Sequence, residues 1–423
     1  MAAAGAGCIM TGAYTDPLPR AAAAVRDPNA AGMTAGEQMS SGDGTRLEVE
    51  NLVKTYEIGG RRTVEALRGI SFTVRDGEFL TLLGPSGCGK STALRCIAGL
   101  ESPTSGRITV DGSTDLVNER IYVPAHKRKM GMVFQSYAVW PHMTVRDNVA
   151  YPLTGGRRRR ISGRERREVE EKVAEVLRVV GLEGFQPRGV NALSGGQQQR
   201  VAVGRAIVRD TNLLLLDEPL SNLDAQLRRQ MRVEFRRISR AFGLTTVYVT
   251  HDQAEALSMS DRIAVMNAGR IEQLASPEEI YERPASRFVG RFLGNLNTLE
   301  GEVVEAGDDL SAVRLTAPGL EGTTLRGVST TGALAVGSEV VVGLRPHLIE
   351  VVQDAAARGG AASDMNVLNG KVIDVQYLGV FRELLVEVGA QAQVRATVPS
   401  HTPVALGDTV SVQTPHARTL LLR

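Results

Sequence analysis

The sequence is poor in cysteine, in aromatic residues and in long apolar runs. Its 423 residues include three cysteines and one tryptophan, and aromatic residues make up 4% of the chain. Cys8, Cys88 and Cys96 do not have the paired spacing of metal ligands, which indicates a reducing compartment without structural disulfides. No apolar run approaches the ~20 residues that a membrane-spanning helix needs. If the protein acts in a membrane process, other chains must therefore provide the path through the membrane.

The chain also lacks an excess of charge of either sign. Its 49 basic and 47 acidic residues give a net charge of +2, so bulk charge predicts no nucleic-acid partner. A local exception is the basic run Arg157–Arg160, which continues with Arg164, Arg166 and Arg167. Nucleic acid and anionic lipid are candidate partners for such a run. A solvated loop and helix start is the favoured interpretation, because no aromatic residues are interleaved and several glutamates follow.

The length of the sequence, and the change in its composition and residue pattern along the chain, predict more than one domain. Residues 1–44 are rich in Ala, Gly and Ser without apolar periodicity, and we expect them to be disordered. Residues 45–290 have the pattern of a mixed α/β domain with a helical region. Residues 297–423 have an all-β pattern of short alternating stretches separated by glycines. Within them, Leu299–Val304 is echoed by Leu368–Ile373, which indicates a duplicated β module.

Apolar periodicity predicts the main elements. Ser162 and Glu165 have the spacing of a capping box at the start of a helix. Strands are expected at 47–52, 79–83, 213–216 and 246–250, with 213–216 in the centre of the sheet, and further along at 302–304, 340–344, 371–375, 384–388 and 394–398. Helices are expected from Lys90 to about Leu100, between about Pro141 and Ser194, and along the apolar positions Leu223, Leu227, Met231, Phe235, Ile238 and Phe242.

A glycine-rich loop lies between the apolar run 79–83 and the helix expected after it. The loop matches the phosphate-binding pattern G-x-x-x-x-G-K-[ST] with Gly84, Pro85, Ser86, Gly87, Cys88, Gly89, Lys90 and Ser91, and Thr92 continues into the helix. Glycines let the backbone wrap a triphosphate, and the positive end of the helix adds to the field. Lys90 is expected to reach the β- and γ-phosphates of ATP, and the Ser91 hydroxyl to hold Mg²⁺. A chance glycine turn is the alternative, and the flanking strand and helix count against it.

The apolar run 213–216 ends in two carboxylates. Asp217 is placed to bind Mg²⁺ through water, and Glu218 is placed to orient an attacking water. Phosphoryl transfer needs such positioning more than it needs covalent chemistry. An apolar strand that ends in Asp-Glu is common by itself, but together with the phosphate loop it indicates an ATPase.

Further segments resemble landmarks of the ATP-binding-cassette (ABC) ATPase family and occur in that family's order. Leu193–Gln197 resembles the signature motif, Gln135 the Q-loop glutamine, and Ser221–Asp224 the D-loop. His251 resembles the switch histidine, and Tyr56 lies where the family stacks an aromatic ring on adenine. A core position is the alternative for Tyr56, because one aromatic residue is weak evidence for stacking.

The resemblance implies roles for these residues. The family forms a head-to-tail homodimer, in which the signature motif of one subunit completes the nucleotide site of the other. The signature residues and Asp224 are thereby assigned to nucleotide binding: Ser194, Gly195, Gly196 and Gln197. Gln135 would sense Mg²⁺ and the γ-phosphate, and His251 would stabilise the departing phosphate. The implied catalytic set is Glu218, His251 and Gln135, and the implied metal set is Ser91, Gln135 and Asp217.

One cassette with no membrane span and a C-terminal β extension resembles the importer subunits that serve sugars, polyamines, ferric iron and some oxyanions or phosphonates. Gly343–Pro346 resembles the Arg-Pro element of the TOBE domain in that branch, although His347 stands where many relatives have Glu. Ser136–His142 looks most like ferric-iron and polyamine subunits. Its aromatic residues suggest an exposed contact cluster, with a core position as the alternative for Trp140.

The resemblance therefore implies an α/β P-loop ATPase domain with a helical subdomain, followed by an all-β, OB-like TOBE domain with a regulatory role. Hydrolysis of ATP with Mg²⁺ would drive solute import through two permease subunits at the cytoplasmic face of the membrane, with a solute-binding protein as an indirect partner. A soluble ABC protein of translation or DNA repair, an exporter subunit and a non-enzymatic scaffold are the alternatives. The single cassette argues against the translation or repair protein, and the β extension argues against the exporter subunit. The intact catalytic motifs argue against the scaffold.

Overall fold

The computed structural model describes residues 44–59, 62–155, 162–209, 211–353 and 363–423. Nearly all of the segment expected to be disordered, and the run Arg157–Arg160, lie outside the described residues. Within them, no helix is long and apolar enough to cross a membrane. The free cysteines Cys88 and Cys96 are both buried.

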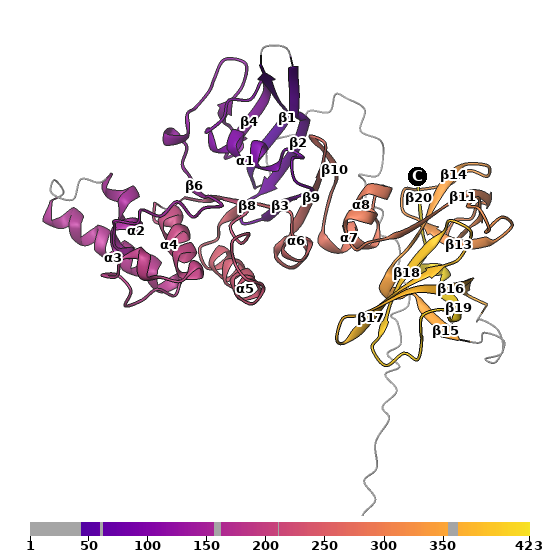
Figure 1. The fold of residues 1–423 in the computed structure, drawn as a ribbon. Helices are drawn as coiled ribbons and strands as arrows, with labels where there is room; N and C mark the ends of the chain where they lie inside the picture. The colour runs from indigo at the N-terminus through magenta and orange to yellow at the C-terminus, as the bar shows by residue number, and fades with distance from the viewer. Residues whose placement is uncertain (1–43, 60–61, 156–161, 210, 354–362) are drawn as a thin grey trace, which may run out of the picture. The chain divides into compact units, whose positions relative to one another are not determined.

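The α/β part is built on a six-stranded sheet with the order β10-β9-β3-β8-β7-β6 (Figure 1). All neighbours are parallel except β9 and β10. The strands are β3 (Phe79–Leu83), β6 (Met130–Val133), β7 (Leu213–Asp217), β8 (Thr245–Thr250), β9 (Arg262–Asn267) and β10 (Arg270–Ala275). Every residue of β3, β7 and β8 is buried, as expected for parallel strands covered on both faces. Residues 213–216 were predicted to form a central strand, and β7 is an interior strand with β8 on one side and β6 on the other.

Helices cover this sheet and extend beyond it. They are α1 (Lys90–Ala98), α2 (Val145–Thr154), α3 (Gly163–Val179), α4 (Gly195–Ile207), α5 (Ala225–Ala241), α6 (Gln253–Met259), α7 (Pro277–Glu282) and α8 (Arg287–Phe292). Alternate residues of β3 serve opposite faces: Leu80 shares a buried cluster with Leu94 of α1, and Phe79 shares one with Phe235 of α5. The long helix expected from Leu223 begins two residues later, because Asp224 caps it.

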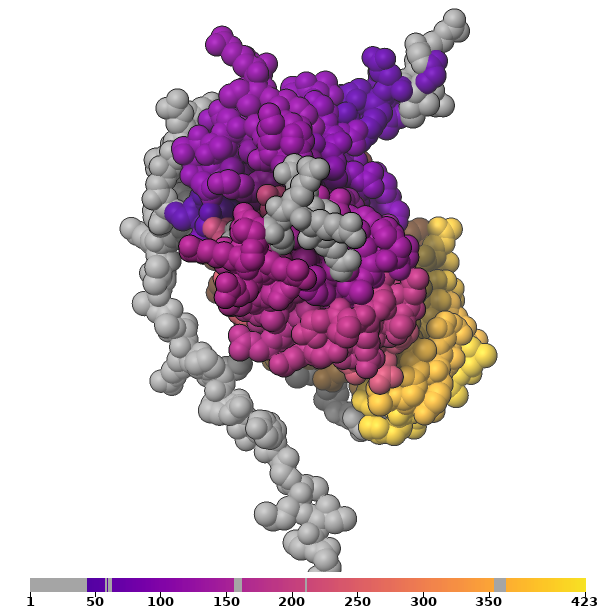
Figure 2. Space-filling view, turned by 90° about the vertical axis from the view of Figure 1, so that its left-hand side faces the viewer, coloured from indigo at the N-terminus to yellow at the C-terminus, as the bar shows by residue number. Residues whose placement is uncertain are grey.

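The expected helical region is present as α2, α3 and α4, which gather on the face shown in Figure 2. The capping box at the start of α3 is confirmed: Glu165 N–H donates to Ser162 Oγ at 3.2 Å, and Ser162 N–H donates to Glu165 Oε2 at 2.7 Å. The inward face of α3 packs its buried Val176 and Leu177 with Val201 of α4. Beside the parallel sheet, an antiparallel sheet has the order β2-β1-β4-β5. Its strands are β1 (Thr45–Ile58), β2 (Arg62–Arg75), β4 (Ser105–Val110) and β5 (Thr114–Val117).

The contact cluster expected in Ser136–His142 is only partly exposed. Tyr137 was expected to be exposed, but it is buried in the core that α2, α3 and α4 share. Trp140 is half-buried, with its ring centroid 4.2 Å from that of Tyr151 and 4.7 Å from the Arg205 guanidinium. Tyr137 is buried because residues of α2, α3 and α4 pack around it, and its backbone has a φ of 60°.

The C-terminal part is all-β, as predicted. A closed barrel has the order β11-β12-β13-β20-β14, which is the five-stranded closure of an OB-like fold. A second sheet has the order β15-β19-β16-β17-β18. The strands are β11 (Asn297–Glu305), β12 (Ser311–Leu315), β13 (Thr324–Ser329), β14 (Glu339–Leu344), β15 (Glu350–Gln353), β16 (Met365–Tyr377), β17 (Phe381–Glu387), β18 (Gln393–Pro399), β19 (Thr409–Pro415) and β20 (Leu420–Leu422).

The two echoed sequences occupy equivalent places in this part. The first lies in β11, between β12 and β14, and the second lies in β16, between β17 and β19. Gly337 N–H donates to Val303 O at 2.8 Å, and Gly407 N–H donates to Val372 O at the same distance. The last strand of each copy is exchanged: β15 pairs with β19 of the second copy, and β20 closes the barrel of the first. The structure thus supports a duplicated module with swapped end strands.

Candidate active site

The predicted catalytic residues come together because four neighbouring strands end at one edge of the parallel sheet. Leu83 of β3 is paired with Thr250 of β8, Asp217 of β7 with Val249, and Val133 of β6 with Leu216. The phosphate loop, His251, Glu218 and Gln135 each follow the end of one of these strands. Ligands of open α/β sheets bind at this carboxyl edge.

The phosphate loop runs from β3 into α1, as the motif predicts. A Cβ on Gly84 would lie 2.3 Å from Met266 O, and a Cβ on Gly89 would lie 2.4 Å from Ala66 O. Gly89 also has a φ of 106° at the N-cap of α1, a conformation that L side chains rarely adopt. Both positions therefore require glycine, which leaves the loop open as a backbone cradle for phosphate.

Lys90 is 4% exposed and turns back over the loop. Its ammonium donates to Gly84 O at 2.8 Å and to Pro85 O at 2.9 Å. These hydrogen bonds hold the Lys90 ammonium over the phosphate loop. Ser91 Oγ donates to Asp217 Oδ1 at 2.7 Å, so the hydroxyl and carboxylate assigned to Mg²⁺ already face each other.

Glu218 and His251 form the other half of this cluster. Glu218 Oε2 lies 3.2 Å from His251 Nδ1. The backbone of Glu218 has a φ of 44°, and its N–H donates to Val249 O at 3.0 Å. A left-handed conformation at a residue that is not glycine costs about 1–3 kcal/mol and is concentrated at functional sites. In this turn the Glu218 carboxylate meets His251, which directly follows β8.

Gln135 and the D-loop are connected directly. Asn222 Nδ2 donates to Gln135 O at 3.0 Å. Asp224 caps α5 by accepting from the N–H groups of Gln226 at 3.0 Å and Leu227 at 2.9 Å. The Asp224 carboxylate therefore has a structural task besides the one predicted for it.

The signature motif is placed apart from these contacts. Ser194 and Gly195 are exposed at the start of α4, where Ser194 N–H donates to Gln197 Oε1 at 3.0 Å. A Cβ on Gly196 would lie 3.0 Å from Leu227 of α5, so this glycine lets the two helices approach. Among the residues that the structure describes, no hydrogen bond joins 194–197 to the phosphate loop.

Tyr56 is half-buried near the start of α1. Its hydroxyl shares hydrogen bonds with Glu101 and Thr92, and burial raises its pKa most, followed by the Glu101 carboxylate. Lys54 Nζ lies 4.8 Å from the ring centroid, over one face. The contact with Thr92 places the Tyr56 hydroxyl beside the start of α1, next to the phosphate loop.

The residues at this edge fit a magnesium nucleotide. Ser91 and Asp217 offer the hard oxygen ligands that Mg²⁺ prefers, and phosphates usually provide further ligands. The loop that Gly84 and Gly89 keep open provides backbone N–H groups, and Lys90 provides the charge.

Comparison with known proteins agrees with this geometry. Residues 67–221 match the ABC transporter family, and residues 342–422 match the TOBE domain. The trehalose/maltose import ATP-binding protein MalK of Thermococcus litoralis is 45% identical over 343 residues, which are 80% of this chain and 88% of the relative. This chain belongs to the import ATP-binding proteins of ABC transporters. It is accordingly an ATPase subunit that couples ATP hydrolysis to transport.

Other members of the family are similar to the same extent. The Fe(3+) ions import ATP-binding protein FbpC of Agrobacterium fabrum is 45% identical over 338 residues, covering 80% of this chain and 86% of the relative. The spermidine/putrescine import ATP-binding protein PotA of Frankia alni is 44% identical over 351 residues, covering 80% of this chain and 70% of the relative. Similarity at this level extends through most of each chain, so it includes the TOBE part as well as the cassette.

Sequence reasoning missed a buried network behind His251 in this import ATPase. Glu255 is 3% exposed and accepts from Tyr248 Oη at 2.7 Å and from Thr250 Oγ1 at 2.6 Å. Burial raises the pKa of Glu255, and Asp252 caps α6 by accepting from its N–H at 3.1 Å. The network fixes both ends of the turn that carries His251. The spacing of Asp252 and Glu255 just after a β-branched run is the sequence signal that could have found it.

Proposed function

We propose that the edge formed by β3, β8, β7 and β6 is the ATP-hydrolysing site, with the residues in the roles that the motifs predict. Lys90 and the loop N–H groups of 84–92 bind the phosphates, Glu218 orients and deprotonates the attacking water, and His251 stabilises the departing phosphate. The observation that carries this proposal is the pair of contacts Ser91–Asp217 and Glu218–His251 at neighbouring strand ends. Both pairs include a residue that ends or directly follows one of the neighbouring strands β7 and β8, which supports a single site at this edge.

The same proposal assigns the metal ligands. Ser91, Asp217 and Gln135 hold Mg²⁺, directly or through water. The ion, when bound, neutralises the phosphate oxygens that gain charge. Gln135 is linked through its carbonyl to Asn222, so its position depends on the D-loop. Tyr56 stacks on adenine with the ring face that Lys54 leaves free.

We propose further that a second copy of the chain completes each site. Ser194, Gly195 and Asp224 are exposed, and the first N–H groups of a helix such as α4 have no partner within the helix, which favours an anion there. In a head-to-tail homodimer these groups contact the γ-phosphate held by the partner's phosphate loop. Closing and opening of the dimer then provide the motion that transport needs.

Two permease subunits are the proposed membrane partners, with the ATPase docked at the cytoplasmic face. Residues 45–290 form the proposed nucleotide-binding domain, and 297–423 the regulatory TOBE domain. The segment Ser136–His142 follows Gln135 directly and has an exposed Pro141, which supports a role in the permease contact. Its sequence favours a cargo of ferric iron or polyamine, delivered by a solute-binding protein, and the relatives named for these cargoes support both.

A mixed dimer tests the composite site. One subunit carries Lys90→Ala and the other Ser194→Arg, so that one site of the dimer is doubly damaged and the other is intact. The matched control joins a Lys90→Ala/Ser194→Arg double variant to the wild-type chain, with the same two substitutions but one damaged element in each site. We expect the mixed dimer, which keeps one intact site, to have about half of the wild-type ATPase rate. The control dimer, which has a damaged element in each site, should have a far lower rate. Equal rates in the two dimers would overturn the composite site.

A further inference from the structure

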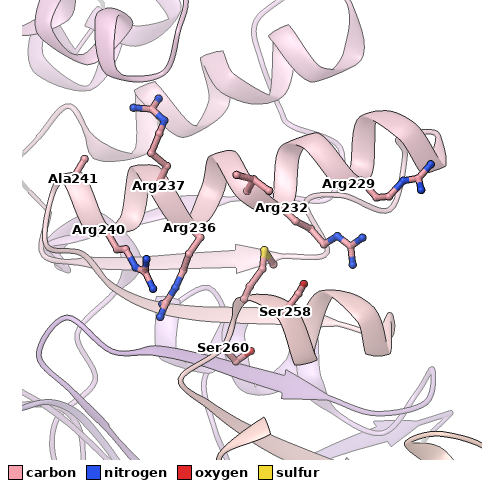
Figure 3. A pocket seen from close by; sticks show the side chains of 10 residues that line it. Arg229, Arg232, Arg236, Arg237, Arg240, Ala241, Ser258 and Ser260 are labelled. Atoms are coloured by element: carbon pink, nitrogen blue, oxygen red, sulfur yellow. The ribbon is translucent and has the colours of Figure 1, made fainter. Parts of the chain in front are cut away.

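Helix α5 carries a row of arginines along one face. Arg229, Arg232, Arg236 and Arg240 follow at helical spacing, so their side chains leave the same side of the helix. They line an open groove of about 1020 Å³ between α5 and the end of α6. Figure 3 shows Arg232, Arg236 and Arg240 extending toward the segment with Ser258 and Ser260, whereas Arg237 extends away. The row spans roughly 16 Å, at 1.5 Å per helical residue.

Most of this positive charge is not neutralised by the protein. Arg236 forms an ion pair with Asp261, and Arg237 forms one with Glu234. For Arg229, Arg232 and Arg240, the described residues show no ion pair. The side chains that line the groove include no carboxylate, and its remaining residues are Val233, Ala241, Met259 and the two serines. Asp261 lies just beyond it, where its ion pair with Arg236 and the nearby charge of Arg240 hold its pKa low against the effect of burial.

We propose that this groove binds a linear chain of phosphates, with inorganic polyphosphate as the defining ligand. Guanidinium groups bind phosphate oxygens in pairs of parallel hydrogen bonds, and this geometry favours phosphate over a single carboxylate. A row along a helix suits an extended ligand, and its walls suit a chain better than a flat membrane surface. The groove has no aromatic side chain on which a nucleic-acid base would stack.

The position of the groove connects it to the ATPase. Its first wall, α5, begins at the D-loop residue Asp224, and its second, α6, begins two residues after His251. A ligand that bridges Arg232 or Arg236 to Ser258 therefore joins the two helices that start at catalytic motifs. This inference goes beyond ATP hydrolysis, since it adds a second ligand with its own site.

The test is titration of the full chain with fluorescent polyphosphate while ADP saturates the nucleotide site, so that the phosphate loop is unavailable. The groove variant is Arg229→Gln/Arg232→Gln/Arg240→Gln. The control variant is Arg164→Gln/Arg166→Gln/Arg167→Gln, which removes the same charge from the exposed start of α3. We expect the groove variant to bind at least tenfold more weakly, and the slope of log affinity against log salt to fall by about two, at ~0.7 for each lost phosphate contact. The control should keep wild-type affinity.

Comparison ligands test whether the groove prefers a long phosphate chain to other anions. Tripolyphosphate is too short for the row and should bind more weakly than the long chain. Single-stranded DNA, anionic vesicles and polyglutamate should also bind more weakly, and any of these binding as tightly as polyphosphate would overturn the proposal. Equal losses in the two triple variants would overturn it too. Melting temperature and ADP affinity are measured for each variant, and Arg→Lys at the same three positions, which keeps the charge, should give an intermediate affinity with the fold intact.

Discussion

The parallel sheet and the C-terminal β part place their polar side chains in different ways. In the parallel sheet, β3, β7 and β8 are buried throughout, and the residues proposed for catalysis follow their ends, in the phosphate loop and at Glu218 and His251. In the C-terminal part, strands such as β18 alternate between buried and exposed residues, so their polar side chains lie along the strand. Strands buried on both faces can present polar groups only at their ends, so a parallel sheet concentrates them at one edge. The C-terminal part instead uses strand pairing to connect two copies of one module.

The largest expected difference between the two regions is in the hydrolysis rate after one carboxylate is removed from each. Glu218→Gln should keep ATP binding and lower the hydrolysis rate by about 10²–10⁴-fold, because it keeps the shape and removes the base. It should also trap an ATP-bound dimer. The matched control is Glu300→Gln in β11, where the exposed carboxylate forms an ion pair with Arg287 at 3.2 Å. Single-turnover ATPase measurements on both variants check this, and near-wild-type turnover in Glu218→Gln would remove Glu218 from the mechanism.

A smaller effect is expected where the two regions meet. Arg345 is 2% exposed, lies 3.9 Å from the Tyr281 ring and donates to the carbonyl oxygens of Tyr281, Gly290 and Leu293. Arg345→Ala should lower the free energy of unfolding by about 3 kcal/mol, because buried carbonyl groups lose a charged donor. ATP affinity should stay unchanged, since the phosphate loop is not involved.

His347→Ala is the control for that junction. His347 is exposed and meets Tyr281 Oη at 3.4 Å, so its loss should cost well under 1 kcal/mol. Thermal unfolding with and without ATP measures both variants. If Arg345→Ala lowered the free energy of ATP binding as much as the free energy of unfolding, nucleotide binding would depend on the contacts of Arg345. The two regions would then not be separable by this substitution.

The smallest expected effects test the duplication itself. A Cβ on Gly301 of β11 would lie 2.5 Å from Val313 Cγ1, and a Cβ on Gly370 of β16 would lie 2.4 Å from Glu387 O. Gly301→Ala and Gly370→Ala should each lower the free energy of unfolding by about 1–3 kcal/mol, as overpacking does. Gly163→Ala is the control, because its Cβ would meet nothing within 4 Å. Denaturant titration compares the three variants, and a loss at only one of the paired glycines would show that the copies are not equivalent.

Local patterns were reliable wherever a short segment determines its own structure. The strand, loop and helix around Lys90 and the capping box at Ser162 follow from residue types a few positions apart. The exposure of Tyr137 was predicted wrongly, because helices α2, α3 and α4 bury it and their packing is not visible in the segment itself. The short strands β12, β13, β15, β19 and β20 were missed, because runs of three to seven residues carry little periodicity.

The sequence alone was enough to predict the family and to propose the site, since Lys90, Gln135, Ser194, Asp217 and His251 resemble landmarks of ABC ATPases in that family's order. Tertiary structure decided the rest. It set the order of the sheet, which brings Ser91 to 2.7 Å from Asp217 across 126 residues of chain, and it placed Arg229, Arg232 and Arg240 of α5 beside the end of α6. It also exchanged β15 and β20 between the two modules. The physical reason is that strand order and strand exchange depend on hydrogen bonds between distant backbones, which are alike for almost every side chain.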